Sequence, residues 1–368
     1  MTDGLEPQRT SLNEDEIHAQ LTSWFRKKVS DPTASISDFG RPSGSGMSSE
    51  TLLFSATWET EGSKQERDLV ARLAPTPQDI PVFPSYDLSL QVEVMRLVGN
   101  QTKIPVPKTL WLEKSRDVLG VPFFVMEKIA GRVPADIPPY VFGGWLLDAG
   151  KEERSRLEKS AVNVIAQISQ IDISNIDTSF LELQTKGDTA LERHFSNQMD
   201  YYSWVVKDQR KHPVIEAASE WLQENWPEES ETVLSWGDAR IGNIMFGLET
   251  FQPTAVLDWE MAGLAPVEVD LGWMVFLHKF FQNIAEVLEF DGMPDFMHSE
   301  KVSDYYSQIT GKTSNDLRWF EIYAGMRHAI IMSRINDRSV HFGETEWTTD
   351  VDSAIPHRDL LWSMISGN

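Results

Sequence analysis

Three side chains between residues 233 and 260 have the types and spacing that phosphoryl transfer requires. Asp238 and Asn243 stand five residues apart on a short glycine-containing loop, and Asp258 follows the apolar stretch 255–257 about one hairpin later. Transfer from a nucleotide needs a carboxylate that orients the attacking hydroxyl and accepts its proton, together with oxygen ligands that hold Mg²⁺ on the phosphates. We therefore interpret Asp238 as the catalytic base and Asn243 and Asp258 as Mg²⁺ ligands. The alternative is that Asp238 and Asn243 only stabilise turns.

The stretch before residue 127 reads as a small antiparallel sheet. An amphipathic helix is expected at 11–29, where apolar residues recur every four positions, and a second helix at 88–98. Strands are expected at 36–39, 51–58, 68–73, 109–112 and 121–126. We therefore expect an N-terminal, nucleotide-binding lobe of residues 1–127, in which one helix crosses the sheet.

After residue 128 the pattern changes to the 3.6-residue spacing of helices. Helices are expected at 157–171, 188–207, 213–225, 270–290, 300–309 and 316–336. The loop and hairpin at 233–260, which carry the three candidate residues, lie in the middle of this half. We expect a larger, mainly helical C-terminal lobe of residues 128–368, and the fold class is α+β.

The composition narrows the possible partners. The net charge of −23, from 56 acidic and 33 basic residues, argues against a nucleic-acid partner, because phosphate binding usually needs a basic face. The same charge is compatible with steering a cationic substrate, or with solubility alone. There are no cysteines, so disulfides and thiolate metal sites are excluded. The N-terminus lacks a signal-peptide pattern, and the most apolar stretch, 271–281, is too short to span a bilayer. We expect a cytoplasmic protein with no membrane partner, and we leave its oligomeric state open.

Along residues 34–275 the chain resembles the aminoglycoside phosphotransferase family, whose members share a bilobal protein-kinase-like fold with choline and homoserine kinases. Six features occur in the family's order: a glycine-serine turn, a strand ending in a basic residue, a helix with an inward Glu, the Val125-Met126-Glu127 strand before a glycine-containing hinge, a Gly-Asp-x4-Asn loop, and an Asp-Trp-Glu strand end. Each feature is a weak signal alone, but six in order are specific. The resemblance implies the bilobal fold and the use of ATP and Mg²⁺ to phosphorylate a small-molecule hydroxyl.

The resemblance also implies phosphate-binding residues in the N-terminal lobe. Arg72 ends the third strand, and its guanidinium can bind two phosphate oxygens and still pair with Glu93 on the helix. The alternative for Arg72 is an ordinary surface ion pair. The turn at 44–51 should close over the β- and γ-phosphates with its backbone N–H groups and the hydroxyls of Ser48 and Ser49.

The hinge and the catalytic loop are interpreted by the same resemblance. The edge of adenine would meet the backbone of Glu127 and Ile129. Trp236 stands where the family usually has His, and its indole can donate one hydrogen bond but cannot titrate. This departure concerns the geometry of the loop rather than its chemistry. Asp270 matches a family Asp that opens a helix, and it is expected to brace the catalytic loop.

These features predict an ATP-dependent phosphotransferase with an alcohol group as acceptor. Family acceptors include aminoglycosides, choline-like amines, sugars and hydroxyacyl groups on coenzyme A, and the sequence does not choose among them. A non-catalytic pseudokinase is the alternative, favoured by Trp236 and Arg72. A metal-dependent hydrolase would need more His or carboxylate ligands than residues 233–260 offer. Aromatic residues at 140–145 and 201–204 either line the acceptor pocket, as in the family, or pack in the core.

Overall fold

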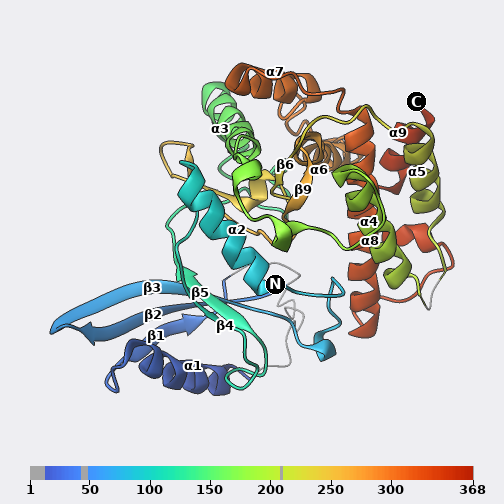
Figure 1. Cartoon of the computed structure of the whole chain (residues 1–368). Helices are drawn as coiled ribbons and strands as arrows, with labels where there is room; N and C mark the ends of the chain where they lie inside the picture. The colour runs from blue at the N-terminus through green and yellow to red at the C-terminus, as the bar shows by residue number, and fades with distance from the viewer. Residues whose placement is uncertain (1–12, 43–48, 208–209, 368) are drawn as a thin grey trace.

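A five-stranded antiparallel sheet forms the centre of the N-terminal lobe (Figure 1). The computed structural model describes residues 13–42, 49–207 and 210–367. The strands are β1 (Ser35–Gly40), β2 (Glu50–Thr60), β3 (Ser63–Leu73), β4 (Thr109–Glu113) and β5 (Phe123–Glu127), in the spatial order β1-β2-β3-β5-β4. Strands β2 and β3 pair along their whole length, so alternate residues of β2 face the core and Leu52, Phe54 and Ala56 are buried.

Two helices flank this sheet. Helix α1 (Glu14–Val29) begins after Asn13, whose side chain accepts hydrogen bonds from the backbone N–H groups of Asp15 and Glu16. The helix was expected from residue 11, and that position lies outside the described residues. Helix α2 (Leu88–Gln101) contacts β4 and β5 and lies between the sheet and the C-terminal lobe (Figure 1).

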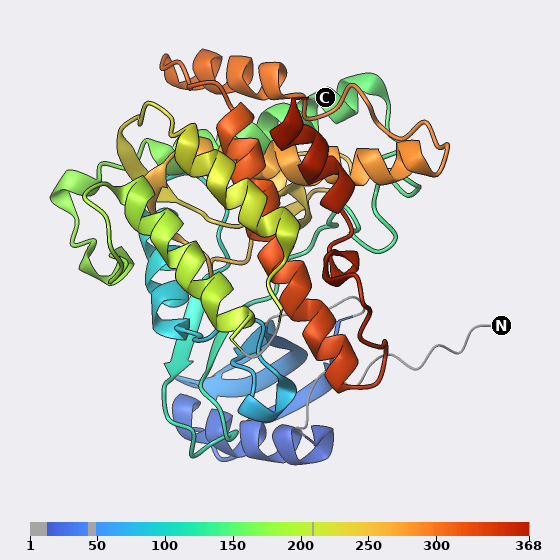
Figure 2. The same cartoon turned by 90° about the vertical axis from the view of Figure 1, so that its right-hand side faces the viewer.

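The C-terminal lobe is mainly helical. Its helices are α3 (Lys151–Ser169), α4 (Ala190–Val205), α5 (Pro213–Glu224), α6 (Glu268–Val287), α7 (Ser299–Thr310), α8 (Arg318–His341) and α9 (Arg358–Ser366). Two short antiparallel pairs interrupt them, β6 (Thr232–Ser235) with β9 (Gly263–Pro266), and β7 (Ile244–Phe246) with β8 (Pro253–Val256). Figure 2 shows α4, α5, α8 and α9 packed side by side on one flank. The expected α+β bilobal fold is thus confirmed, whereas α9 and the β6–β9 pair were not expected.

The two lobes are joined by direct hydrogen bonds as well as by the hinge after β5. The segment between β3 and α2 crosses to the C-terminal helices, where Tyr201 Oη donates to the Val82 carbonyl (3.0 Å) and Arg334 Nε donates to the Pro81 carbonyl (2.9 Å). One hydrophobic core cluster runs from α1 through the sheet to α3 and α6. These contacts fix the sheet relative to the hairpin β7–β8.

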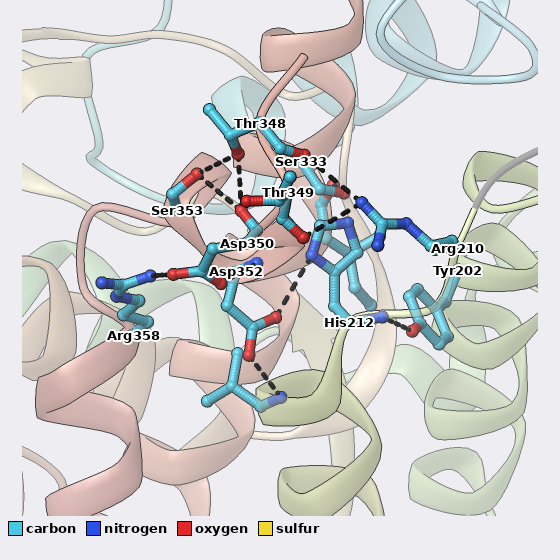
Figure 3. Close-up of polar contacts among 12 residues, drawn as sticks. Tyr202, Arg210, His212, Ser333, Thr348, Thr349, Asp350, Asp352, Ser353 and Arg358 are labelled. Carbon is cyan, nitrogen blue, oxygen red and sulfur yellow. Dashed lines mark hydrogen bonds and ion pairs between the residues drawn. The ribbon is translucent and has the colours of Figure 1, made fainter.

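The segment after α8 is tied to the start of α5 by a polar cluster (Figure 3). Asp352 Oδ2 accepts a hydrogen bond from the backbone N–H of Val214 (3.1 Å), and its Oδ1 lies 3.4 Å from His212 Nδ1. Asp352 therefore satisfies one of the free N–H groups at the N-terminus of α5, which its own N-cap residue leaves open. None of the helices in the described parts of the chain combines the length and apolarity needed to cross a bilayer.

Candidate active site

One buried carboxylate, that of Asp270, accepts hydrogen bonds from three groups at the start of the loop after β6. Asp270, in the first turn of α6, accepts hydrogen bonds from Ser235 Oγ (2.9 Å) and from the backbone N–H groups of Trp236 (2.8 Å) and Gly237 (2.9 Å). Burial raises the pKa of Asp270, although these donors and the nearby Arg327 act in the opposite direction. Asp270 thus braces the loop that carries Asp238, as expected from the sequence.

The loop brings Asp238 and Asn243 into contact. Asn243 closes a single 3₁₀ turn (Ile241–Asn243), and its Nδ2 donates to Asp238 Oδ2 (2.7 Å) and to the Asp238 carbonyl (3.1 Å). Because the amide nitrogen makes both of these contacts, the amide oxygen of Asn243 is not used by them. The turn interpretation and the catalytic interpretation are compatible here, since the same hydrogen bond shapes the loop and orients the carboxylate.

Backbone pairing places Leu257, the residue before Asp258, opposite Asn243. In the β7–β8 hairpin Ile244 lies opposite Val256, and the N–H of Leu257 donates to the Asn243 carbonyl (2.9 Å). Asp258 then adopts a positive φ of 60°, a conformation that is uncommon for a non-glycine residue.

The indole of Trp236 braces the end of the hairpin that carries Asp258. Trp236 is fully buried, and its Nε1 donates to the carbonyls of Leu257 (3.0 Å) and Asp258 (3.2 Å). The residue that departs from the family therefore performs a bracing task that needs only an N–H donor.

Arg72 pairs with Asp258 and not with Glu93. Its Nη2 lies 3.3 Å from Asp258 Oδ1, and its Nη1 donates to Thr51 Oγ1 (3.1 Å). Glu93 is exposed on α2, so the expected Arg72–Glu93 pair was wrong. The buried face of α2 instead carries Gln91, at 3% exposure. The spacing of the buried residues around Gln91 is the signal that could have set the helix register.

The nucleotide-binding roles expected for the turn at 44–51 and for the hinge residues stay predictions. Ser48 lies outside the described residues. Ser49 is buried, and its hydroxyl has no hydrogen-bond partner among the described residues. In the hinge, the N–H of Glu127 donates to the Lys108 carbonyl (3.1 Å), while the N–H of Ile129 meets no acceptor in the described part of the chain. Ile129 is therefore the better placed of the two to receive a hydrogen-bonding ligand.

Arg240 links the loop that carries Asp238 to the segment after the hinge. Its Nη1 forms an ion pair with Asp136, and its Nε lies 3.4 Å from Asp238 Oδ2. Burial alone lowers the pKa of Arg240, but the carboxylates of Asp238, Asp136 and Asp258 together raise it above its usual value. Arg240 was missed from the sequence, although its place two residues after Asp238 was a usable signal.

The donor set suits Mg²⁺. The Asn243 amide oxygen and the Asp258 carboxylate are hard oxygen ligands, and Mg²⁺ commonly takes one or two such ligands and completes its shell with phosphates and water. Within the described ranges, no three or more His, Cys, Asp or Glu side chains are grouped so that they could hold a metal ion. A cation at this site would therefore depend on a bound nucleotide for the rest of its coordination.

The aromatic residues at 140–145 and 201–204, which were candidates for lining the acceptor pocket, mostly pack in the core. Tyr140 is buried and hydrogen-bonds His278 Nδ1 (2.8 Å), and Tyr201 and Tyr202 are also buried. Of the others, Trp145 is partly buried beneath the Arg132 guanidinium, whose Cζ lies 3.9 Å from a ring centroid of that indole. The core interpretation holds for the three tyrosines.

Comparison with known proteins gives consistent matches. A model of the phosphotransferase enzyme family matches residues 52–291. A probable acyl-CoA dehydrogenase, IBR3, of Arabidopsis thaliana is 24% identical over 297 residues, which cover 77% of this chain and 34% of the relative. The human acyl-CoA dehydrogenase family member 11 is 29% identical over 168 residues, covering 45% of this chain and 20% of the relative. This chain thus spans about a third or less of the length of these relatives.

Solved structures share the fold over nearly the whole chain. A protein of Ralstonia eutropha described as an aminoglycoside phosphotransferase has a TM-score of 0.66 at 22% identity, with 94% of this chain and 96% of the other covered. A thermostable variant of aminoglycoside phosphotransferase APH(4)-Ia, in complex with ADP and hygromycin B, has a TM-score of 0.55 at 15% identity, covering 95% and 99%. At these identities the similarity concerns the fold.

Proposed function

The chain belongs to the phosphotransferase enzyme family, and from this premise we propose that it uses ATP and Mg²⁺ to phosphorylate a hydroxyl of a small molecule. One observation carries the proposal. Asp238, Asn243 and Asp258 are brought together by hydrogen bonds of the loop and hairpin, and Arg72 of the N-terminal sheet reaches the same point. A carboxylate base, an amide, a second carboxylate and a guanidinium are the groups that phosphoryl transfer needs.

Each residue has a role that follows from its position. Asp238 accepts a hydrogen bond from the acceptor hydroxyl and takes its proton as the new bond to phosphorus forms. Asn243 and Asp258 offer the oxygens that would hold Mg²⁺, which when bound neutralises charge on the β- and γ-phosphates. Arg72 contacts phosphate oxygens, and the hydroxyl of Ser49 donates a hydrogen bond to them. Because the transition state is largely dissociative, most of the catalysis comes from positioning.

Two acceptor classes follow from two different observations. The net charge of −23 favours the approach of a cationic acceptor such as an aminoglycoside, and the matched APH(4)-Ia structure holds hygromycin B. The relatives named acyl-CoA dehydrogenases favour a hydroxyacyl thioester of coenzyme A. The dehydrogenase activity in those names is not proposed for this chain.

Acceptor-stimulated ADP release tests the proposal. The purified chain, with ATP and Mg²⁺, is offered aminoglycosides, choline-like amines, sugars and hydroxyacyl thioesters, and the phosphorylated product is identified by mass. We expect one class to raise ADP release well above the rate without acceptor. No stimulation by any class, and no hydrolysis of ATP, would contradict the proposal.

A pseudokinase that binds nucleotide without catalysis is the second candidate. The observation that favours it is the pairing of Arg72 with Asp258, which leaves Arg72 without the helix carboxylate expected of an active kinase-like site. The two candidates differ in Mg²⁺ dependence. A catalytic site predicts that ATP stabilises the fold against heat only with Mg²⁺, whereas stabilisation by ATP alone favours the pseudokinase.

A further inference from the structure

Asp238 accepts a hydrogen bond from a tryptophan to which the proposed mechanism gives no role. Trp273 lies on α6, one turn after Asp270, and its Nε1 donates to Asp238 Oδ1 at 2.7 Å. The other carboxylate oxygen, Oδ2, accepts from Asn243 Nδ2 at 2.7 Å and lies 3.4 Å from Arg240 Nε. The carboxylate is therefore fixed at both ends, by donors from the loop on one side and from α6 on the other.

The hydrogen-bond donors around Asp238 show which of its two carboxylate oxygens is available to the hydroxyl of the acceptor molecule. A carboxylate oxygen accepts about two hydrogen bonds. Oδ2 is already approached by two donors, while Trp273 is the one donor to Oδ1 among the residues that the structure describes. Oδ1 is therefore the atom with a free lone pair, and the direction of that lone pair is set by where the indole N–H lies.

A buried arginine holds the indole in place. Arg327 of α8 is 1% exposed, and its Cζ lies 4.4 Å from a ring centroid of Trp273. Its Nη2 donates to the Gly237 carbonyl (3.1 Å), on the residue just before Asp238. Helices α6 and α8 thus fix the indole and the loop backbone together, and the indole cannot turn without disturbing both.

We propose that Trp273 is a positioning residue that points Oδ1 of Asp238 at the acceptor hydroxyl. This inference rests on the proposed function. In the step it serves, the acceptor O–H bond breaks and its proton moves to Oδ1. The acceptor oxygen forms a bond to the γ-phosphorus of ATP, and the bond from that phosphorus to the β–γ bridging oxygen breaks to release ADP.

The matched pair Trp273→Phe and Trp319→Phe tests the inference. Both remove one buried indole donor, but Trp319 donates to the Leu222 carbonyl (3.0 Å), in the cluster of helices α4, α5 and α8. We expect Trp273→Phe to lower kcat about ten- to a hundredfold with little change in the KM for ATP. Trp319→Phe should keep the kcat of the unmodified chain. Equal kcat in the two variants, or a loss of kcat in Trp273→Phe explained by the fraction unfolded, would overturn the inference.

An NMR measurement keeps the test decisive if Trp273→Phe does not fold or if no acceptor is found. In the chain labelled at the indole nitrogens, three of the 13 indoles donate to carboxylates within the described ranges: Trp24 to Glu113, Trp226 to Glu229 and Trp273 to Asp238. The variants Trp24→Phe and Trp226→Phe assign the first two of these signals, and the third is then the Trp273 signal. We expect that signal to move in Asp238→Ala while the other indoles stay. An unmoved set of signals overturns the contact, whereas a chain that never releases ADP overturns the proposed function instead.

Discussion

Arg72 on β3 and Asp258 after β8 form an ion pair across the two lobes, with 3.3 Å between Nη2 and Oδ1. Both side chains are largely shielded from water, at 14% and 18% exposure. The pair joins the sheet that would bind nucleotide to the hairpin that would bind Mg²⁺. In the nucleotide-bound enzyme we expect Asp258 to exchange the guanidinium for the cation, which frees Arg72 to contact phosphate.

Replacing this arginine tests that exchange. Arg72→Ala removes the charge-assisted hydrogen bonds to phosphate, so we expect the KM for ATP to rise about ten- to a hundredfold. Arg67→Ala is the control, because Arg67 lies on the same strand in an exposed pair with Glu127 and such pairs contribute about 0–1 kcal/mol. Steady-state kinetics and ATP titration measure the effect. Similar KM values for the two variants would contradict a phosphate-binding role.

The bracing role of Trp236 gives a prediction about stability. Trp236→Phe keeps most of the ring volume but leaves the carbonyls of Leu257 and Asp258 without their donor, and we expect the free energy of unfolding to fall by about 1–3 kcal/mol. The exposed Trp362 provides a control, for which Trp362→Phe should change stability by less than about 0.5 kcal/mol. Urea denaturation compares the two. Equal stabilities would show that the indole is not a brace.

Gly237 is required by the shape of the loop. It has a φ of 87°, and a Cβ at this position would lie 1.9 Å from the Met261 carbonyl oxygen. We therefore expect Gly237→Ala to cost about 3 kcal/mol or more and to abolish turnover. Gly263→Ala is the matched control, since a Cβ there meets nothing within 4 Å. A stable, active Gly237→Ala chain would mean that the loop has another conformation.

Two buried histidines should make stability depend on pH. Burial lowers the pKa of His278 and of His357 to about 4 in the folded chain. The unfolded chain, with pKa about 6.5, takes up protons first as pH falls, so stability is full above about pH 6.5 and is lost toward pH 4. Each histidine can account for about 3 kcal/mol at most across that window.

Urea denaturation between pH 8 and pH 5 measures this loss. His278→Gln should flatten part of the decline, because it removes one of the buried histidines whose pKa is lowered, the others being His194, His212, His328 and His357. His341→Gln changes an exposed histidine and should leave the slope as it is. An unchanged slope in His278→Gln would show that this histidine is protonated alike in both states.

Much of the fold followed from local pattern in the sequence. The strands and helices of the N-terminal lobe were predicted because their alternating or 3.6-residue apolar spacing reflects burial against one core. Asp238, Asn243 and Asp258 were predicted to act together because short loops and a hairpin connect them. Asp270 was added through the resemblance to the family.

The residues of the candidate site that were not predicted lie far from the loop in the sequence, or have the apolar surroundings of core residues. Trp273 and Arg327 reach the loop only because α6 and α8 pack beneath it, and an indole in an apolar helix carries no sign of a polar task. The predicted pairing of Glu93 with Arg72 was wrong because a change of one or two residues in helix register moves a side chain to another face of the helix. Helix α9 has nine residues, too few for a periodic pattern to be specific.

We propose that Asp238 is the base of a phosphotransferase and that the nucleotide site does not depend on it. Turnover and ATP binding by Asp238→Ala test this most directly, with Asp117→Ala, at an exposed position in the N-terminal lobe, as control. We predict that Asp238→Ala loses acceptor-stimulated ADP release by about a thousandfold or more while it still binds ATP with Mg²⁺ nearly as tightly as the unmodified chain. Turnover equal to that of the Asp117→Ala control would contradict the role of Asp238 as the base.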